Sequence, residues 1–228
     1  MPSTSDTARP AQTSHAYILL DRTGSMSPIW DEALSSVNAY ADGLAHPEGG
    51  KPSGADDRIT LAVFDHHSGL QFDVLRSAVA AASWTPVTSN EAAPRGMTPL
   101  FDAIARIIAM AEADNPGRAI IVIMTDGEEN ASREVTKEGV KAALDRVKAK
   151  GWEVVFLGAE FSKFADAEAI GVAAGKRMAM SSGSLNTSMR NLASKSRSFF
   201  DAASDTVEFN EADRREAGED DVKRRKGS

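Results

Sequence analysis

The sequence contains no cysteine, has fewer basic than acidic residues and lacks any long apolar run. The absence of cysteine excludes a disulfide framework, a thiolate zinc site and a thiol nucleophile. Because 26 Lys and Arg stand against 33 Asp and Glu, the formal net charge is −7, and nothing attracts the chain as a whole to nucleic acid or to an anionic membrane surface. The longest apolar runs are about one strand long, well short of the roughly 20 residues of a membrane-spanning helix. The first residues also lack the apolar stretch of a signal peptide, so we expect a cytoplasmic protein that binds neither membrane nor nucleic acid.

The two ends of the chain differ in composition from the middle. Residues 1–14 are mostly Ser, Thr, Pro and Ala, and they cannot bury enough apolar surface to offset the entropy lost on ordering. Of the last 24 residues, 14 are charged, and this stretch contains the basic run Lys223-Arg224-Arg225-Lys226. We therefore expect a flexible segment over 1–14, one domain over 15–204 and a charged, flexible tail over 205–228.

Between those ends, short apolar runs alternate with helical patterns. The apolar runs predict strands at 16–20, 59–64, 70–75, 119–124, 152–157 and 177–180. Apolar residues at steps of three and four predict helices that begin at Ser27-Pro28 and at Thr98-Pro99, and others over 132–150, 161–170 and 185–203. The run His66-His67-Ser68-Gly69 indicates a hairpin turn. This order of elements predicts one α/β domain with a doubly wound, mostly parallel sheet.

Side chains that carry oxygen follow two of these strands and begin one helix. Asp21, Thr23 and Ser25 follow the first strand, and Asp126 follows the central one. Thr98 precedes a helix that leads back to that central strand. Ligands of doubly wound sheets bind beyond the carboxyl ends of the parallel strands, where the crossover helices also begin. We therefore expect these five side chains to converge at one edge of the sheet.

All five candidate residues present oxygen, and none presents nitrogen or sulfur. Such a site favours hard cations, Mg²⁺, Mn²⁺ or Ca²⁺, over zinc. Because only two of the five are carboxylates, the protein would barely neutralise a divalent ion, which would keep waters or accept an anionic oxygen from outside. The residues therefore predict a metal site that is open to a ligand from another molecule.

Three segments carry a resemblance to a known family. Together they resemble the metal-ion-dependent adhesion site of von Willebrand factor type A domains, and they stand in that family's order: Asp21-Arg-Thr-Gly-Ser25, Gly96-Met-Thr98-Pro-Leu100 and Ile123-Met-Thr-Asp126-Gly127. The resemblance extends over residues 15–204 and implies a six-stranded sheet with one antiparallel edge strand. It also implies an ion bound directly or through water by Thr23, Ser25 and Thr98, with two carboxylate partners, Asp21 and Asp126. The departure is Thr23, where serine is commoner, and its hydroxyl can do the same work.

The resemblance implies a function in binding rather than in catalysis. Within the family, the chain looks most like small intracellular bacterial and phage-type proteins, which consist of the bare domain and often work beside other proteins such as ATPases. We therefore expect a non-enzymatic protein-interaction module with a Mg²⁺, Mn²⁺ or Ca²⁺ ion and a partner protein that supplies an Asp or Glu carboxylate. No catalytic residue is expected.

Alternative interpretations exist for the same residues. Asp21 and the segment after it resemble the phosphorylation loop of haloacid-dehalogenase-like phosphotransferases, with Asp21 as the nucleophile. That interpretation leaves Thr98 without a role and finds Asn130 where a second acidic residue should stand. Another alternative is a structural component of a phage or bacterial assembly, with a metal site that it does not need. At single positions, Ser25 and Thr98 fit ordinary helix caps, and four charges near the site fit a solvated rim: Arg22, Arg95, Glu128 and Glu129.

Overall fold

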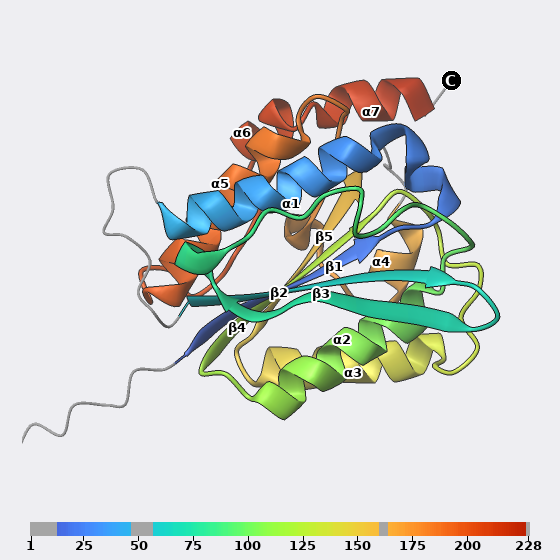
Figure 1. The fold of residues 1–228 in the computed structure, drawn as a ribbon. Helices are drawn as coiled ribbons and strands as arrows, with labels where there is room; N and C mark the ends of the chain where they lie inside the picture. The colour runs from blue at the N-terminus through green and yellow to red at the C-terminus, as the bar shows by residue number, and fades with distance from the viewer. Residues whose placement is uncertain (1–12, 47–56, 160–163, 227–228) are drawn as a thin grey trace, which may run out of the picture.

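The computed structural model describes residues 13–46, 57–159 and 164–226. They contain a six-stranded sheet in the order β3-β2-β1-β4-β5-β6, in which β2 and β3 pair antiparallel and the other neighbours pair parallel (Figure 1). The strands are β1 (Ser14–Asp21), β2 (Asp57–His66), β3 (Leu70–Ala80), β4 (Arg118–Thr125), β5 (Glu153–Ala159) and β6 (Arg177–Met180). The prediction of a mostly parallel six-stranded sheet with one antiparallel edge strand is confirmed.

Helices cover both faces of the sheet (Figure 1). One face carries α1 (Trp30–Ala45), α5 (Leu185–Phe200), α6 (Glu211–Glu216) and α7 (Glu219–Lys226). The other face carries α2 (Leu100–Asp114), α3 (Lys137–Ala149) and the short α4 (Ala165–Ala169). Among the described residues, no helix combines the length and the apolar character that crossing a membrane requires.

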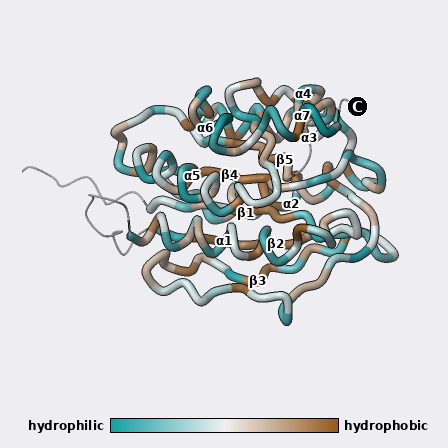
Figure 2. Tube along the Cα trace, turned by 90° about the horizontal axis from the view of Figure 1, so that it is seen from above, coloured by the Kyte–Doolittle hydropathy of each residue, from teal (hydrophilic) through white to brown (hydrophobic). Residues whose placement is uncertain are grey.

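Each face of the sheet has its own apolar core, because side chains alternate along every strand. In β1, Ile18 and Leu20 belong to the core under α1 and α5, whereas Tyr17 and Leu19 belong to the core under α2 and α3. All eight residues of β1 are buried, so both faces of this strand are apolar and the sequence reads as a continuous run. Figure 2 shows the hydrophobic residues concentrated along the central strands.

Two helices begin later than their sequence patterns predict. Ser27-Pro28 lies inside a 3₁₀ helix (Gly24–Ile29), and α1 starts only at Trp30. The helix expected over 132–150 starts at Lys137, where the hydroxyl of Thr136 accepts a hydrogen bond from the amide of Gly139 at 3.2 Å. A 3₁₀ helix comes before α1 and a loop comes before α3, and both segments carry or support candidate site residues.

For residues 205–226, the expectation of a flexible tail is wrong. Within this stretch Val207, Phe209, Ala217 and Val222 are buried, and the first three belong to the core under α1 and α5. The Glu219 carboxylate also accepts a hydrogen bond from the amide of Ala179 at 3.2 Å, at the edge of β6. A few well-spaced apolar residues in a charged run are enough to cover an exposed strand edge. The flexible segment expected at the other end falls on residues 1–14, of which 1–12 lie outside the described residues, and Ser14 already belongs to β1.

Candidate metal site

The three predicted segments meet at the carboxyl ends of β1 and β4. The hydroxyl of Thr98 donates to the Thr23 hydroxyl at 3.4 Å, across 75 residues of sequence. Thr23 Oγ1 lies 3.1 Å from Ser25 Oγ, and Ser25 in turn donates to Asp126 Oδ1 at 2.7 Å. Four of the predicted residues therefore form one continuous row of oxygen atoms drawn from three separate parts of the chain.

Asp21 lies behind this row and is fully buried. Its Oδ1 accepts from the amide of Thr23 at 2.8 Å, and its Oδ2 accepts from the hydroxyl of Thr125 at 2.7 Å. Burial raises the pKa of Asp21 to about 7, although these hydrogen bonds from Thr125 and Thr23 lower it and the charge of Asp126 raises it further. A carboxylate that is costly to ionise in this way is stabilised by a nearby cation, so Asp21 suits a supporting role behind the ion.

The spacing of the oxygen row fits a small divalent ion. Ligands of an octahedral Mg²⁺ lie at 2.0–2.1 Å from the metal, so neighbouring ligands are roughly 2.9 Å apart. The separations of 2.7, 3.1 and 3.4 Å between the side-chain oxygens bracket that value. A Cβ atom added at Gly127 would lie 3.4 Å from Thr98 Oγ1 and 3.8 Å from Ser25 Oγ, so glycine at this position leaves the approach to the hydroxyls open.

Hydroxyl groups must provide part of any metal site here. Across the described ranges, no group of three or more His, Cys, Asp or Glu side chains is arranged to hold a metal ion. The donor set at the sheet edge is instead two carboxylates with three neutral hydroxyls, which is the oxygen-only set of a hard cation. The residues present therefore fit Mg²⁺ or Mn²⁺.

Backbone hydrogen bonds fix the loop at residues 95–98 against the loop that follows β1. The amide of Gly24 donates to the carbonyl of Gly96 at 3.3 Å, and the amide of Arg95 donates to the carbonyl of Arg22 at 2.8 Å. Gly96 has φ +72°, and a Cβ atom there would lie 2.3 Å from the carbonyl oxygen of His66. Only glycine fits this close approach, which brings Thr98 to Thr23.

Asn130 holds the backbone of Thr98 on both sides. The amide of Thr98 donates to Asn130 Oδ1 at 2.9 Å, and the amide of Asn130 donates to the Thr98 carbonyl at 3.1 Å. This pair joins the loop after β4, which carries Asp126, to the segment that carries Thr98. This role of Asn130 could not be predicted from the sequence, because its partner lies 32 residues away.

Two carboxylates organise the loop between Asp126 and α3. Glu129, expected as a solvated rim charge, instead accepts hydrogen bonds from the amides of Phe101, Ala131 and Ser132 and from the Ser132 hydroxyl, at 2.6–2.9 Å. Asp102 in the first turn of α2 accepts from the three successive amides of residues 133–135. These carboxylates satisfy amides that the sequence pattern assigned to a helix, which explains the late start of α3.

Arg22 is another predicted rim charge that the structure buries. Its Nε lies 2.5 Å from Asp65 Oδ2 and its Nη2 lies 2.6 Å from Asp73 Oδ2, which ties the ligand loop to β2 and β3. Asp65 is fully buried and also accepts from Arg95 Nε at 3.2 Å. Removing one partner of such a buried ion pair leaves an uncompensated charge, so this network supports the position of the loop.

The helix-cap interpretation of the hydroxyl residues lacks support in the geometry. Neither the 3₁₀ helix after Thr23 nor α2 has a side-chain cap, and the N-cap of α2 is Pro99. Ser27 donates its hydroxyl hydrogen to the carbonyl of Gly24 at 2.8 Å. The hydroxyls of Ser25 and Thr98 contact the other site residues instead.

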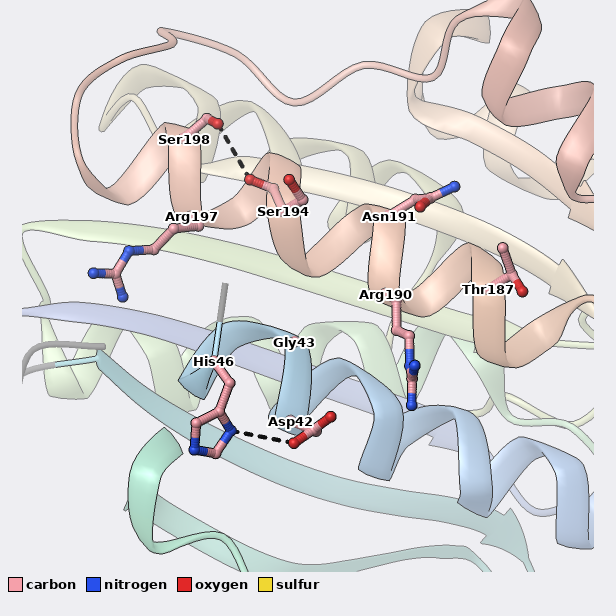
Figure 3. A pocket seen from close by; sticks show the side chains of 9 residues that line it. All are labelled: Asp42, Gly43, His46, Thr187, Arg190, Asn191, Ser194, Arg197 and Ser198. Atoms are coloured by element: carbon pink, nitrogen blue, oxygen red, sulfur yellow. Dashed lines mark hydrogen bonds and ion pairs between the residues drawn. The ribbon is translucent and has the colours of Figure 1, made fainter. Parts of the chain in front are cut away.

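A pocket of about 600 Å³ lies elsewhere, between α1 and α5 (Figure 3). Several of its lining groups bond to their neighbours: His46 Nδ1 lies 3.2 Å from Asp42 Oδ1, and the Ser198 hydroxyl donates to the Ser194 carbonyl at 3.2 Å. Arg197 pairs with Asp57 and Asp201. None of the five predicted site residues lines this pocket.

The sequence matches no protein-family model and no curated protein. Solved structures do match. The pilus adhesin SpaC of Lactobacillus rhamnosus GG matches with a TM-score of 0.64 at 13% identity, over 84% of this chain but 31% of the adhesin. The vWF domain of the type V pili tip protein Mfa5 of Porphyromonas gingivalis matches with a TM-score of 0.57 at 10% identity, over 81% of this chain and 95% of that domain. The manganese-loaded TRAP protein of Plasmodium vivax matches with a TM-score of 0.56 at 14% identity, over 78% of this chain and 72% of that protein.

These likenesses concern the fold, because all three identities lie far below the level that carries function. They match the α/β fold described above over 78–84% of this chain. The chain therefore has the fold of the von Willebrand factor type A domains.

Proposed function

We propose that this chain is a protein-interaction module that depends on a divalent metal ion. Thr23, Ser25, Thr98 and Asp126 would hold Mg²⁺, Mn²⁺ or Ca²⁺, with Asp21 behind them, and a partner protein would add an Asp or Glu carboxylate. The observation that carries the proposal is the row of oxygen atoms, 2.7–3.4 Å apart, that joins three distant segments.

The charge balance of the site favours an acidic partner. A divalent ion would supply an electrophile at this edge of the sheet, because the two carboxylates at most neutralise its charge and the three neutral hydroxyls add none. The chain itself carries a net charge of −7 and would repel an acidic surface without a local positive charge. Asp21, held by Thr23 and Thr125, keeps the hydroxyl loop in place while its own oxygens stay occupied.

The same geometry disfavours the phosphotransferase alternative. A nucleophilic aspartate needs a carboxylate oxygen that a substrate can reach. Asp21 is fully buried, and both of its oxygens accept hydrogen bonds. Asn130, which stands where that alternative needs an acid, uses its side-chain oxygen on the amide of Thr98. We therefore propose a binding function with no catalytic residue.

The structural neighbours support the same proposal. SpaC is a pilus adhesin, which is consistent with a protein partner within a larger assembly. The TRAP structure is manganese-loaded, which is consistent with a divalent ion in this fold. An ATPase as the partner and a cytoplasmic location stay predictions from the sequence.

The proposal is tested by affinity capture from the native cell with the full chain as bait, in Mg²⁺ and in EDTA. We expect a partner that is captured in Mg²⁺, lost in EDTA and restored by Mg²⁺ or Mn²⁺. Thr98→Ala and Asp126→Ala should both lose it, whereas the control Ser27→Ala should keep it, because Ser27 bonds only to the Gly24 carbonyl beside the site.

Thermal melts show whether each variant is folded. A native partner that is captured equally well in EDTA, and equally well by both folded site variants, would contradict the proposal. In that case the alternative of a structural component with a non-essential metal site would be favoured.

A further inference from the structure

Met97 is an exposed apolar side chain directly beside the candidate metal site. Within the described ranges, the exposed large apolar side chains are Val74, at 38%, and Met97, at 49%. Met97 immediately precedes Thr98, whose hydroxyl belongs to the oxygen row. The exposed side chain therefore stands one residue away from a candidate ligand, in the loop that carries it.

The backbone on both sides of Met97 is held firmly. Its carbonyl accepts from the amide of His66 at 3.0 Å, and the carbonyl of Gly96 accepts from the amide of Gly24 at 3.3 Å. Because the chain at Gly96 also passes too close to His66 for any other residue, the loop has little freedom to withdraw the side chain. The backbone of the folded protein therefore keeps the Met97 side chain exposed.

Met97 shares one face of the sheet with other side chains. His66 pairs with Leu70 of β3 on one side and forms an antiparallel bridge with Met97 on the other. Residues directly opposite each other in antiparallel pairs place their side chains on the same face. Leu70, His66 and Met97 thus form a row, named here the rim ledge, and Leu70 is partly buried against the core under α2.

The same loop adds a positive charge. Arg95 is 52% exposed, and its Nε lies 3.2 Å from Asp65 Oδ2. Asp65 is shared with Arg22, so it does not balance Arg95 alone, and the exposed guanidinium group adds to the attraction for an acidic partner. Charge and apolar surface therefore lie next to each other at the rim of the site.

We propose that the rim ledge is a second contact for the partner, and that the partner presents an acidic residue flanked by an apolar side chain. The carboxylate would reach the ion, the apolar side chain would cover Met97, and Arg95 would favour acidic partners over neutral ones. This inference rests on the proposed function and adds the chemistry of the partner segment to it.

Two carboxylates that differ in their apolar tail test the rim ledge on the full chain with Mg²⁺. Acetate presents the carboxylate alone, and 4-methylpentanoate adds a leucine-like tail. The protein is labelled with ¹³C at the methionine methyl groups, and the Met97 signal is assigned from its loss in Met97→Leu. We expect the tail to tighten Mg²⁺-dependent binding roughly tenfold, the effect of burying about two methylene groups, and to shift the Met97 signal.

Met97→Ser should remove the preference for the tail while acetate binding in Mg²⁺ stays as it is. The matched control is Val74→Ser, which removes the other exposed apolar side chain, at a position on β3 that pairs with Ala62. A tail preference that survives Met97→Ser, or a Met97 signal that does not move, would overturn the rim ledge and leave the proposed function standing. An affinity for acetate that is the same in Mg²⁺ and in EDTA would contradict the proposed function, and the rim ledge with it.

Discussion

At the scale of single residues, the geometry of the candidate metal site depends on side chains outside the oxygen row. Asn130 is the clearest of these, because its side chain and its amide both hold the backbone of Thr98. Partners behind a metal ligand usually affect metal affinity by 10–100-fold when they are removed. We expect Asn130→Ala to weaken Mn²⁺ binding by about that factor, measured by calorimetry.

The conservative variant Asn130→Asp keeps an oxygen that accepts from the Thr98 amide, so it should recover most of the affinity. Both variants should melt within a few degrees of the native protein, because Asn130 is exposed. Equal Mn²⁺ affinity in the native protein and Asn130→Ala would show that Thr98 needs no support from this loop.

His15 in β1 gives a prediction for the pH dependence of stability. The side chain is buried, its Nε2 lies 2.8 Å from Thr60 Oγ1, and its ring stacks on Tyr17 with 3.9 Å between the centroids. Burial lowers the pKa of His15 to about 4, with Asp114 raising it and Arg58 lowering it by smaller amounts. In the unfolded chain His15 therefore binds a proton below about pH 6.5, whereas in the folded chain it binds one only below about pH 4.

Neutral His15 therefore costs no stability above about pH 6.5. As the pH falls from 6.5 toward 4, the free energy of unfolding decreases by up to about 3 kcal/mol. Urea unfolding at pH 7 and at pH 4.5 measures it. His15→Gln should show a smaller drop between the two pH values than the native protein. His46→Gln, which changes a 73% exposed side chain, should leave the drop unchanged. An identical drop in His15→Gln would contradict the assignment.

At the scale of elements, the C-terminal helices α6 and α7 complete the domain. Phe209 lies in the segment before α6, is 6% exposed, and donates its amide hydrogen to the carbonyl of Gly175 at 2.8 Å. Truncating a buried phenylalanine leaves a cavity and loses apolar burial. We expect Phe209→Ala to lower the free energy of unfolding by about 3 kcal/mol, measured by urea titration.

Arg215→Ala is the control, because this side chain on α6 is exposed, and its effect should stay within about 0.5 kcal/mol. Deletion of residues 205–228 should cost more than Phe209→Ala alone, since it also uncovers β6. A truncated protein that keeps the native melting temperature would show that these helices do not pack on the domain in solution.

The elements differ in how well their sequence predicts them. Strands such as β1 and β4 are buried on both faces, so an apolar run alone predicts them. The start of α3 could not be predicted, because the side chains of Glu129 and Asp102 bind the amides of the preceding residues. The convergence of Thr98 with Thr23 followed from the rule that ligands bind at the carboxyl edge of the sheet. The burial of Arg22 could not be predicted, because it depends on Asp65 of β2 and Asp73 of β3, which are distant in the sequence.

At the scale of the whole molecule, one edge of the sheet collects the candidate metal site, Met97 and Arg95. The two cores fill both faces of the sheet, and the pocket between α1 and α5 contains none of the predicted site residues. A net charge of −7 makes local positive charge at this edge necessary for an acidic partner. Binding should therefore weaken as salt is added, in addition to its loss in EDTA.

Diffraction from crystals of the full chain soaked in millimolar Mn²⁺ shows whether this edge of the sheet holds a divalent ion. Data collected at the manganese absorption edge locate the ion by its anomalous scattering. We expect an anomalous peak within bonding distance of the hydroxyl oxygens of Ser25 and Thr98, and its loss in crystals of Asp126→Ala. A native crystal without a peak among these side chains, or with Mn²⁺ bound only elsewhere on the molecule, would contradict it.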